Sequence, residues 1–209
     1  MRQLTVCGIA AILSAVGLSA HAANLLVDPG FEDPASLTFD GAPFVGTWEG
    51  FNNGGANTTA LSGTNPRTGA SSLDLFLGDA NGFAGAFQEV PAFEGAEVTF
   101  TGWHALATGS VAGGTEVRIE FVDAGGVEVG RTGNLAPSLT ADGNYESFIQ
   151  SGIAPAGTAG ARAVYAIQSF GAGLTQNVFV DDLSMTVIPE PAAVLLALLG
   201  LAPLTRRRS

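Results

Sequence analysis

Short apolar stretches alternate with clusters of Gly, Asn, Asp and Pro throughout residues 23–187. This pattern is typical of many short strands joined by turns, and it contains no long helical period. Alternation is clearest where Val117, Ile119 and Phe121 share one phase and three charged residues share the other. We therefore predict an all-β, two-sheet antiparallel sandwich with strands near residues 25–27, 71–77, 84–90, 97–105, 116–122, 145–152, 161–169 and 178–187.

The last of these predicted strands carries a charge among apolar residues. Phe179, Leu183 and Met185 form its apolar phase, and Asp181 interrupts that phase. Burying a charge without a partner costs several kcal/mol. We therefore expect the Asp181 carboxylate to have a partner in the folded protein.

The N-terminal residues have the pattern of a secretory signal. Arg2 is followed by an almost wholly apolar run over residues 4–18, and small residues stand at Ala20 and Ala22. A buried N-terminal helix is the alternative, but no polar face interrupts the run. We expect residues 1–22 to form a helical signal peptide that signal peptidase removes, and residues 23–187 to form one exported domain.

Charge and cysteine content narrow the choice of partners. Cys7 is the only cysteine and lies in the expected signal peptide, so we expect no disulfide and no cysteine-ligated metal. Residues 23–187 hold four arginines, no lysine and eighteen acidic residues, a formal charge of −14. Such a field repels polyanions but neither divalent cations nor neutral glycans, so we expect no nucleic-acid partner.

Six segments of the predicted domain resemble carbohydrate-binding modules. The opening stretch, NLLVDPGFE at residues 24–32, resembles the start of the family 4, 9 and 22 type modules, which are galactose-binding-like jelly rolls. The resemblance implies a two-sheet antiparallel jelly-roll sandwich whose first and last strands lie together, often tied by a structural calcium. The later segments that follow the order of that family are residues 67–73, 87–91, 98–103, 117–123 and 179–184.

The same resemblance implies a calcium site. Its ligands would be Glu32 from the opening segment and Asp181 or Asp182 from the closing strand, while Asp28 stands where the family usually has Asn. Calcium prefers carboxylate and carbonyl oxygens, and such an ion would also give Asp181 a partner. In the alternative, Glu32 and Asp182 are solvated surface carboxylates and Asp181 caps a backbone group.

Carbohydrate binding would need aromatic platforms beside polar groups that fix hydroxyls. Trp48, Trp103 and Tyr145 are the candidate platforms for glycan contact. In the alternative, both tryptophans are packed inside the domain, which is the commoner fate of large aromatic residues. Residues that could form hydrogen bonds beside these platforms are Gln88, His104, Arg118 and Asn144.

We expect no catalytic activity. His104 is the only histidine left after signal removal, no Gly-x-Ser-x-Gly nucleophile elbow is present, and a zinc site would lack its usual ligands. Paired carboxylates could serve glycoside hydrolysis, but eighteen acidic residues make chance pairs inevitable. A glycan hydrolase is therefore the least favoured of the functions considered.

The C-terminal residues resemble the PEP-CTERM sorting signal of exported proteins in Gram-negative bacteria. Residues 188–209 contain the motif Pro189-Glu190-Pro191, the apolar run 192–204 and the arginines Arg206, Arg207 and Arg208, with Ile188 in place of the usual valine.

The apolar run is too short for a lasting anchor, since as a helix it would be about 20 Å long against a hydrocarbon core of about 30 Å. It suits a hydrophobic helix that stays in the inner membrane transiently, with the arginines on the cytoplasmic side. The resemblance implies an exosortase as partner, delivery to the cell surface or extracellular matrix, and a link to exopolysaccharide and biofilm. Two roles then remain open, contact with extracellular polysaccharide or a structural, adhesive role with no small ligand.

Overall fold

The computed structural model describes residues 22–42, 44, 46–111, 113–171 and 175–189. All regular secondary structure in these residues is β, in eleven strands that form two sheets. The expected sorting residues Glu190, Pro191 and Arg206 to Arg208, the apolar run 192–204 and nearly all of the expected signal peptide lie outside the described residues. No helix within the described ranges is long and apolar enough to cross a bilayer.

Sheet A is the larger of the two sheets. Its neighbouring strands pair antiparallel, except for the short parallel contact between its first two. In spatial order it consists of β1 (Leu37–Thr38), β2 (Trp48–Asn52), β5 (Phe83–Pro91), β10 (Gly160–Gln168), β7 (Gly114–Val122) and β8 (Glu128–Arg131).

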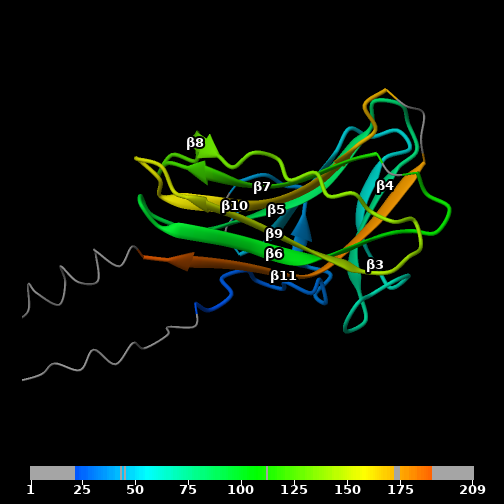
Figure 1. Cartoon of the computed structure of the whole chain (residues 1–209), viewed down its shortest axis with the longest axis horizontal. Coiled ribbons are helices and arrows are strands. Elements are labelled where there is room, and N and C mark those ends of the chain that lie inside the picture. Colours follow the sequence, from blue (N-terminus) through cyan, green and yellow to red (C-terminus); the bar gives the residue numbers. More distant parts are fainter. Residues whose placement is uncertain (1–21, 43, 45, 112, 172–174, 190–209) are drawn as a thin grey trace, which may run out of the picture.

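Sheet B packs against sheet A to complete the sandwich (Figure 1). All of its strands pair antiparallel, which confirms the predicted two-sheet fold. In spatial order it consists of β3 (Thr58–Ser62), β4 (Ser72–Leu77), β11 (Gln176–Ile188), β6 (Glu97–Leu106) and β9 (Glu146–Ile153).

Seven of the eight predicted strands coincide with observed strands, and the exception is residues 25–27. Side chains take the hydrogen-bonding positions there, because the amide of Leu26 donates to Asn24 Oδ1 and that of Val27 donates to Gln88 Oε1. The segment still lies beside β11, where the Leu25 amide donates to the Met185 carbonyl at 2.9 Å. The pattern did not predict β1, β2, β3 and β8, which are short and largely lack a continuous apolar face.

The core lies between the two sheets and is mostly apolar, with a few buried polar side chains. Ala161, Ala163 and Ile167 of β10 face it from sheet A, and buried side chains of β4, β6 and β11 face it from sheet B. Within it, His104 and Tyr165 share a hydrogen bond of 2.6 Å between Nδ1 and the phenol oxygen. Burial lowers the pKa of His104 to about 4, and the Glu146 carboxylate opposes that shift.

A β-bulge in β11 corrects the predicted phase of that strand. The pairing with β6 jumps from Asp181 opposite Trp103 to Ser184 opposite Thr101, so β11 has one extra residue there. Asp182 lies in this bulge and has a left-handed backbone, with a φ of 49°. The core receives Val178 and Val180 before the bulge but Leu183 and Met185 after it. Phe179 and Asp181 therefore face away from the core, on the outer face of sheet B.

Candidate functional site

The outward side chains of β10 form the floor of the candidate site. They are Arg162, Val164, Ala166 and Gln168, which we call the β10 strip, and they alternate with the core residues of the same strand. Val164 and Ala166 point away from the core, yet only 1% and 3% of their surface is exposed. Larger side chains from the strands on both sides therefore rise above the strip and shelter it.

One side of the strip is aromatic. Phe83 and Phe87 project from β5, Phe51 projects from β2, and Phe44 lies in the segment before β2. The ring centroid of Phe51 is 6.3 Å from those of both Phe83 and Phe87. The centroids of Phe44 and Phe87 are 4.8 Å apart. Phe51 lies directly over Gly85, where an added Cβ would come within 2.5 Å of its ring. The glycine thus lets the ring lie flat on the sheet, and the four rings form one continuous aromatic border.

The other side of the strip is charged. Arg118 of β7 donates from Nε to Glu120 at 2.7 Å and from Nη1 to Glu116 at 2.9 Å. Within the strip, Arg162 Nε donates at 3.0 Å to Glu89 of β5, on the aromatic side. These side chains are only 12–19% exposed, so their pairing holds them in fixed positions. The oxygens of Glu116 and Glu120 remain as hydrogen-bond acceptors along the β7 side.

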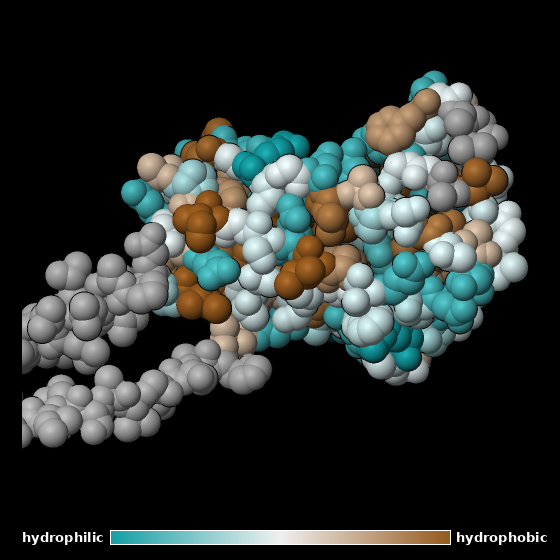
Figure 2. Space-filling view, in the orientation of Figure 1, coloured by the Kyte–Doolittle hydropathy of each residue, from teal (hydrophilic) through white to brown (hydrophobic). Residues whose placement is uncertain are grey.

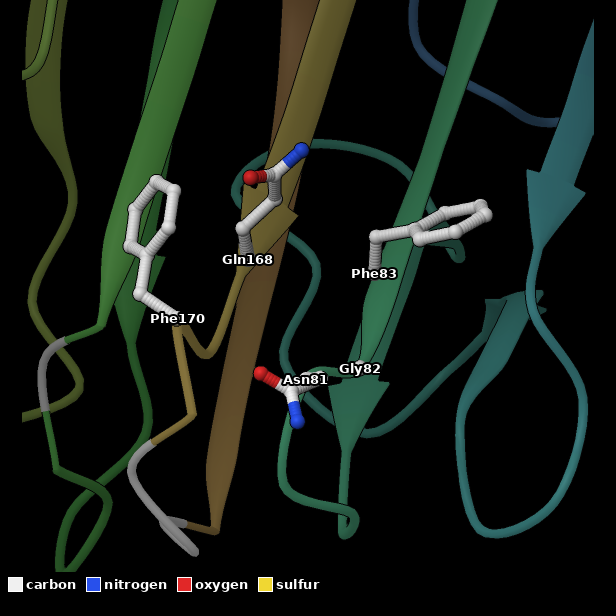
Figure 3. Close-up of a pocket in the computed structure, with 5 residues that line it drawn as sticks. All are labelled: Asn81, Gly82, Phe83, Gln168 and Phe170. Atoms are coloured by element: carbon white, nitrogen blue, oxygen red, sulfur yellow. The ribbon is translucent and has the colours of Figure 1, made fainter.

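A hollow of about 140 Å³ lies at the Gln168 end of the strip. It is lined by Asn81, Gly82, Phe83, Gln168 and Phe170, and Figure 3 shows the Gln168 amide between the two phenylalanine rings. The Phe170 ring covers Gly114, where a Cβ would come within 2.0 Å of it, while 69% of the Phe170 surface remains exposed.

Two features of the hollow suit a binding site. Asn81 and Phe170 have φ angles of 60° and 45°, and such left-handed backbone is costly for a bulky residue like phenylalanine. The Gln168 amide makes no hydrogen bond to another group in the described part of the chain. Exposed rings beside a free amide can hold a ring-shaped ligand that has apolar faces and hydroxyl groups.

The structure contradicts the prediction that Trp48 is a platform for a glycan. Its side chain is fully buried, with the ring centroid 5.0 Å from that of Phe31. The indole Nε1 donates to the carbonyls of Val27 and Asp28, each at 3.2 Å. Trp48 therefore binds the opening segment to the core, as the packed alternative expected.

The structure places Trp103 and Tyr145 with sheet B, away from the β10 strip. The Arg67 guanidinium covers the Trp103 ring at 3.8 Å from its centroid. The Tyr145 hydroxyl donates to the Asn65 carbonyl at 2.6 Å, and burial raises the pKa of Tyr145 to about 12. Of the hydrogen-bonding residues proposed beside the platforms, only Arg118 borders the strip.

The three predicted calcium ligands lie close together but do not fit a calcium centre. Glu32, Asp181 and Asp182 surround Gly30, whose Cβ position lies within 3.9 Å of an atom of each. Their oxygens accept hydrogen bonds from N–H and O–H groups, whereas calcium needs about six to eight oxygen ligands directed at one point. Among the described residues, no group of three or more His, Cys, Asp or Glu side chains is placed to hold a metal.

Sequence reasoning missed the aromatic residues of the hollow. Phe83 lies at the start of a strand that was predicted from residue 84, and Phe170 lies in a turn after the strand predicted to end at residue 169. The outward phase of residues 83–89 reads Phe, Gly, Phe, Glu, which is a usable signal. A large aromatic residue next to a glycine on a solvent-facing phase indicates a ring that lies on the sheet.

Comparisons with known proteins show a shared fold and no close relative. No family model matches the chain, and no curated protein matches it. The CBM22-1 xylan-binding domain of Paenibacillus barcinonensis Xyn10C is 15% identical, with a TM-score of 0.56 over 80% of this chain and 96% of that domain. The module TmCBM61, solved with β-1,4-galactotriose, is 18% identical, with a TM-score of 0.50 over 78% of this chain and 97% of that one.

An enzyme domain has a similar fold. The enzymatically active domain of bacteriophage CBA120 tailspike protein 4 is 16% identical, with a TM-score of 0.57 over 79% of this chain. The match covers 21% of the tailspike chain, so this chain spans about a fifth of that protein. The fold is therefore compatible with more than one function, and it is the β-sandwich fold of carbohydrate-binding modules.

Proposed function

We propose that this protein is an exported, non-catalytic module that binds extracellular polysaccharide through the β10 strip and its hollow. The observation that carries the proposal is the pair of exposed rings, Phe83 and Phe170, on either side of the Gln168 amide. The fold shared with carbohydrate-binding modules supports it.

The chemistry of the strip suits a sugar chain. The C–H faces of a pyranose ring are apolar and pack against phenylalanine rings, while its hydroxyls can bond the Gln168 amide and the carboxylates of Glu116 and Glu120. Because these carboxylates are already held by Arg118, they lose little side-chain freedom when a ligand binds. The strip is therefore largely formed before the ligand arrives.

The delivery of the module is part of the same proposal and rests on the sequence. Residues 1–22 direct export, and residues 188–209 are recognised by an exosortase that sorts the protein to the cell surface or matrix. The described ends of the chain leave from one end of the sandwich, and the loops of the hollow lie at the other (Figure 1). A protein attached through its C-terminal end would thus present the hollow outward.

The sorting part of the proposal has its own test. Glu190→Gln, or glutamine at all three of Arg206, Arg207 and Arg208, should leave the domain folded but should reduce its delivery to the surface. Cell fractionation with an antibody against the folded domain measures this. Normal surface delivery of both variants would refute a sorting role for these residues.

A glycan array with the purified protein tests the binding part. Phe170→Ala and Phe83→Ala should each weaken binding to a captured glycan about tenfold or more, equivalent to about 1.4 kcal/mol. Phe93→Ala is the matched control, because Phe93 is also an exposed phenylalanine but lies outside the hollow. Equal binding by all three variants would refute the proposed site, and turnover of the glycan would refute the non-catalytic role.

A structural or adhesive role without a small ligand is the second candidate. Ile149 and Ile153, on the outer face of the edge strand β9, are 65% and 61% exposed. Figure 2 shows, however, that apolar side chains on the face in view are scattered among polar ones. Absence of glycan binding together with altered cohesion of cells that lack the protein would favour this second role.

A further inference from the structure

The opening segment and the last strand of the domain lie side by side (Figure 1). The Asn24 side chain donates to the Leu183 carbonyl at 3.0 Å and accepts from the Met185 amide at 2.9 Å. The Leu183 amide donates to the Pro29 carbonyl at 2.9 Å. Only a few bonds join these two segments directly, so a third element that crosses both would strengthen the closure of the sandwich.

The loop of residues 65–71 is that third element. Its amides at Arg67 and Thr68 donate to Asp181 Oδ2 of β11, at 2.8 Å and 3.2 Å. Further along, the amides of Ala70 and Ser71 donate to the Glu32 carboxylate of the opening segment, at 3.0 Å and 3.2 Å. The backbone of the loop thus binds Glu32 at the start of the domain and Asp181 at its end.

A glycine in the loop is required for this contact. Gly69 has a φ of 63°, and an added Cβ would lie 2.1 Å from Glu32 Oε1. A side chain at this position would meet both left-handed backbone strain and the carboxylate itself. The close approach of Glu32 to the loop therefore depends on the absence of a side chain at residue 69.

Arg67 supplies the positive charge of this cluster. Its Nη1 donates to Asp182 Oδ2 at 2.5 Å, and the Thr68 hydroxyl donates to the other oxygen of the same carboxylate at 2.7 Å. The guanidinium lies over Trp103, with its central carbon 3.8 Å from the ring centroid, a favourable cation–π geometry. One residue therefore contributes an amide to Asp181 and a cation to Asp182.

The remaining groups hold the loop at its start. The Tyr145 hydroxyl donates to the backbone carbonyl of Asn65, and the side-chain amide of Asn65 donates to the Gly143 carbonyl at 3.2 Å. Trp103 and Tyr145 are thus positioning residues for Arg67 and Asn65, since their polar or aromatic groups are already used within the chain. This gives both residues a role that does not involve a glycan.

We propose that residues 65–71 form a metal-free clasp, in which Arg67 is the internal cation that fastens the opening segment to β11. Glu32, Asp181 and Asp182 have only N–H, O–H and guanidinium partners within the clasp. Calcium then contributes nothing to the stability of the domain. The clasp is independent of the proposed polysaccharide binding, because it lies on sheet B and the strip lies on sheet A.

Thermal unfolding of the purified full chain tests the clasp. The midpoint of the unmodified protein should stay the same, within about 1 °C, after dialysis against EDTA and after addition of calcium chloride. Arg67→Gln should lower the midpoint by roughly 4–8 °C, because it leaves Asp182 without its cation. Arg131→Gln is the matched control, since Arg131 pairs with Glu128 on an exposed edge strand and its loss should shift the midpoint far less.

Two further variants keep the test decisive if Arg67→Gln does not fold. Arg67→Lys keeps the charge but loses the planar stacking on Trp103, so its midpoint should lie between those of the unmodified protein and Arg67→Gln. Gly69→Ala should also lower the midpoint, because it displaces Glu32. A midpoint that falls with EDTA or rises with calcium would overturn the proposal, and so would Arg67→Gln and Arg67→Lys proteins that melt like Arg131→Gln.

Discussion

The outer faces of the two sheets differ in how they use their polar groups. On sheet B, the Asp181 carboxylate accepts from backbone amides, and the Asp182 carboxylate accepts from the Arg67 guanidinium and the Thr68 hydroxyl. On sheet A, the ring of Phe170 is exposed beside the hollow, and the Gln168 amide has no hydrogen-bond partner among the described residues. A dense group of acidic and aromatic residues therefore does not by itself mark a binding site, and the proposed site rests instead on exposed groups that bond no other group among the described residues.

The largest expected effect comes from removing a carboxylate on the outer face of sheet B. Asp181→Ala removes a fully buried carboxylate and leaves the amides of Arg67, Thr68 and Asp182 without an acceptor, which should lower the free energy of unfolding by about 3 kcal/mol. Urea denaturation measures this, with Asp142→Ala in an exposed turn as the control. Glycan binding by the folded fraction should not change. If both variants lose the same stability, Asp181 is not a structural centre.

The next effect comes from His104, which bonds Tyr165 in the core between the two sheets. The pKa of His104 is 6.5 as a free side chain and about 4 in the fold, so between these values the unfolded chain binds more protons. The contribution of His104 is complete above pH 6.5 and is lost as the pH falls towards 4, by about 3 kcal/mol at pH 4.

Urea denaturation across this pH range measures the loss. His104→Phe removes the titrating group, so the difference between its profile and that of the unmodified protein isolates the histidine. Tyr165→Phe retains the titrating group and should keep most of the slope. Parallel profiles for the unmodified and His104→Phe proteins would show that His104 does not titrate as its burial requires.

The sheet pattern was predictable from the sequence because most strands have one wet and one buried face. Val117 and Ile119 of β7 alternate with charged residues, and that strand was found where expected. The bulge at Asp182 was not predictable, since a one-residue shift leaves the composition unchanged while it reverses which side chains face the core. The phase error for Phe179 follows directly from that shift.

The candidate site was harder to predict than the fold. Trp48 and Trp103 were predicted as glycan platforms because they are large aromatic residues. Trp48 instead fills the core, and Trp103 supports Arg67. The hollow instead combines Phe83 and Phe170 from opposite ends of two paired strands, and only the pairing of β5 with β10 brings them to one place. A sequence carries no local signal for such long-range neighbours.

Substitutions in the hollow on sheet A should change glycan binding without changing stability. Phe170→Ala removes an exposed ring and Gln168→Ala removes the free amide, and each should weaken glycan binding about tenfold, or about 1.4 kcal/mol. The free energy of unfolding should change by less than about 0.5 kcal/mol for the exposed Phe170 side chain. Affinity electrophoresis in a glycan gel, run beside urea denaturation, gives both quantities. A large loss of stability with normal binding would make the hollow a structural feature.

The smallest expected effect is also the sharpest test of the contrast between the faces. Trp103→Leu keeps apolar volume under Arg67 but removes the aromatic face, so the free energy of unfolding should fall by about 0.5–1 kcal/mol. In combination with Arg67→Gln the loss should be less than additive, because the two side chains contribute through one contact. Glycan binding should match that of the unmodified protein. A selective loss of glycan binding in Trp103→Leu would instead place a binding site on sheet B and reverse the roles assigned to the two faces.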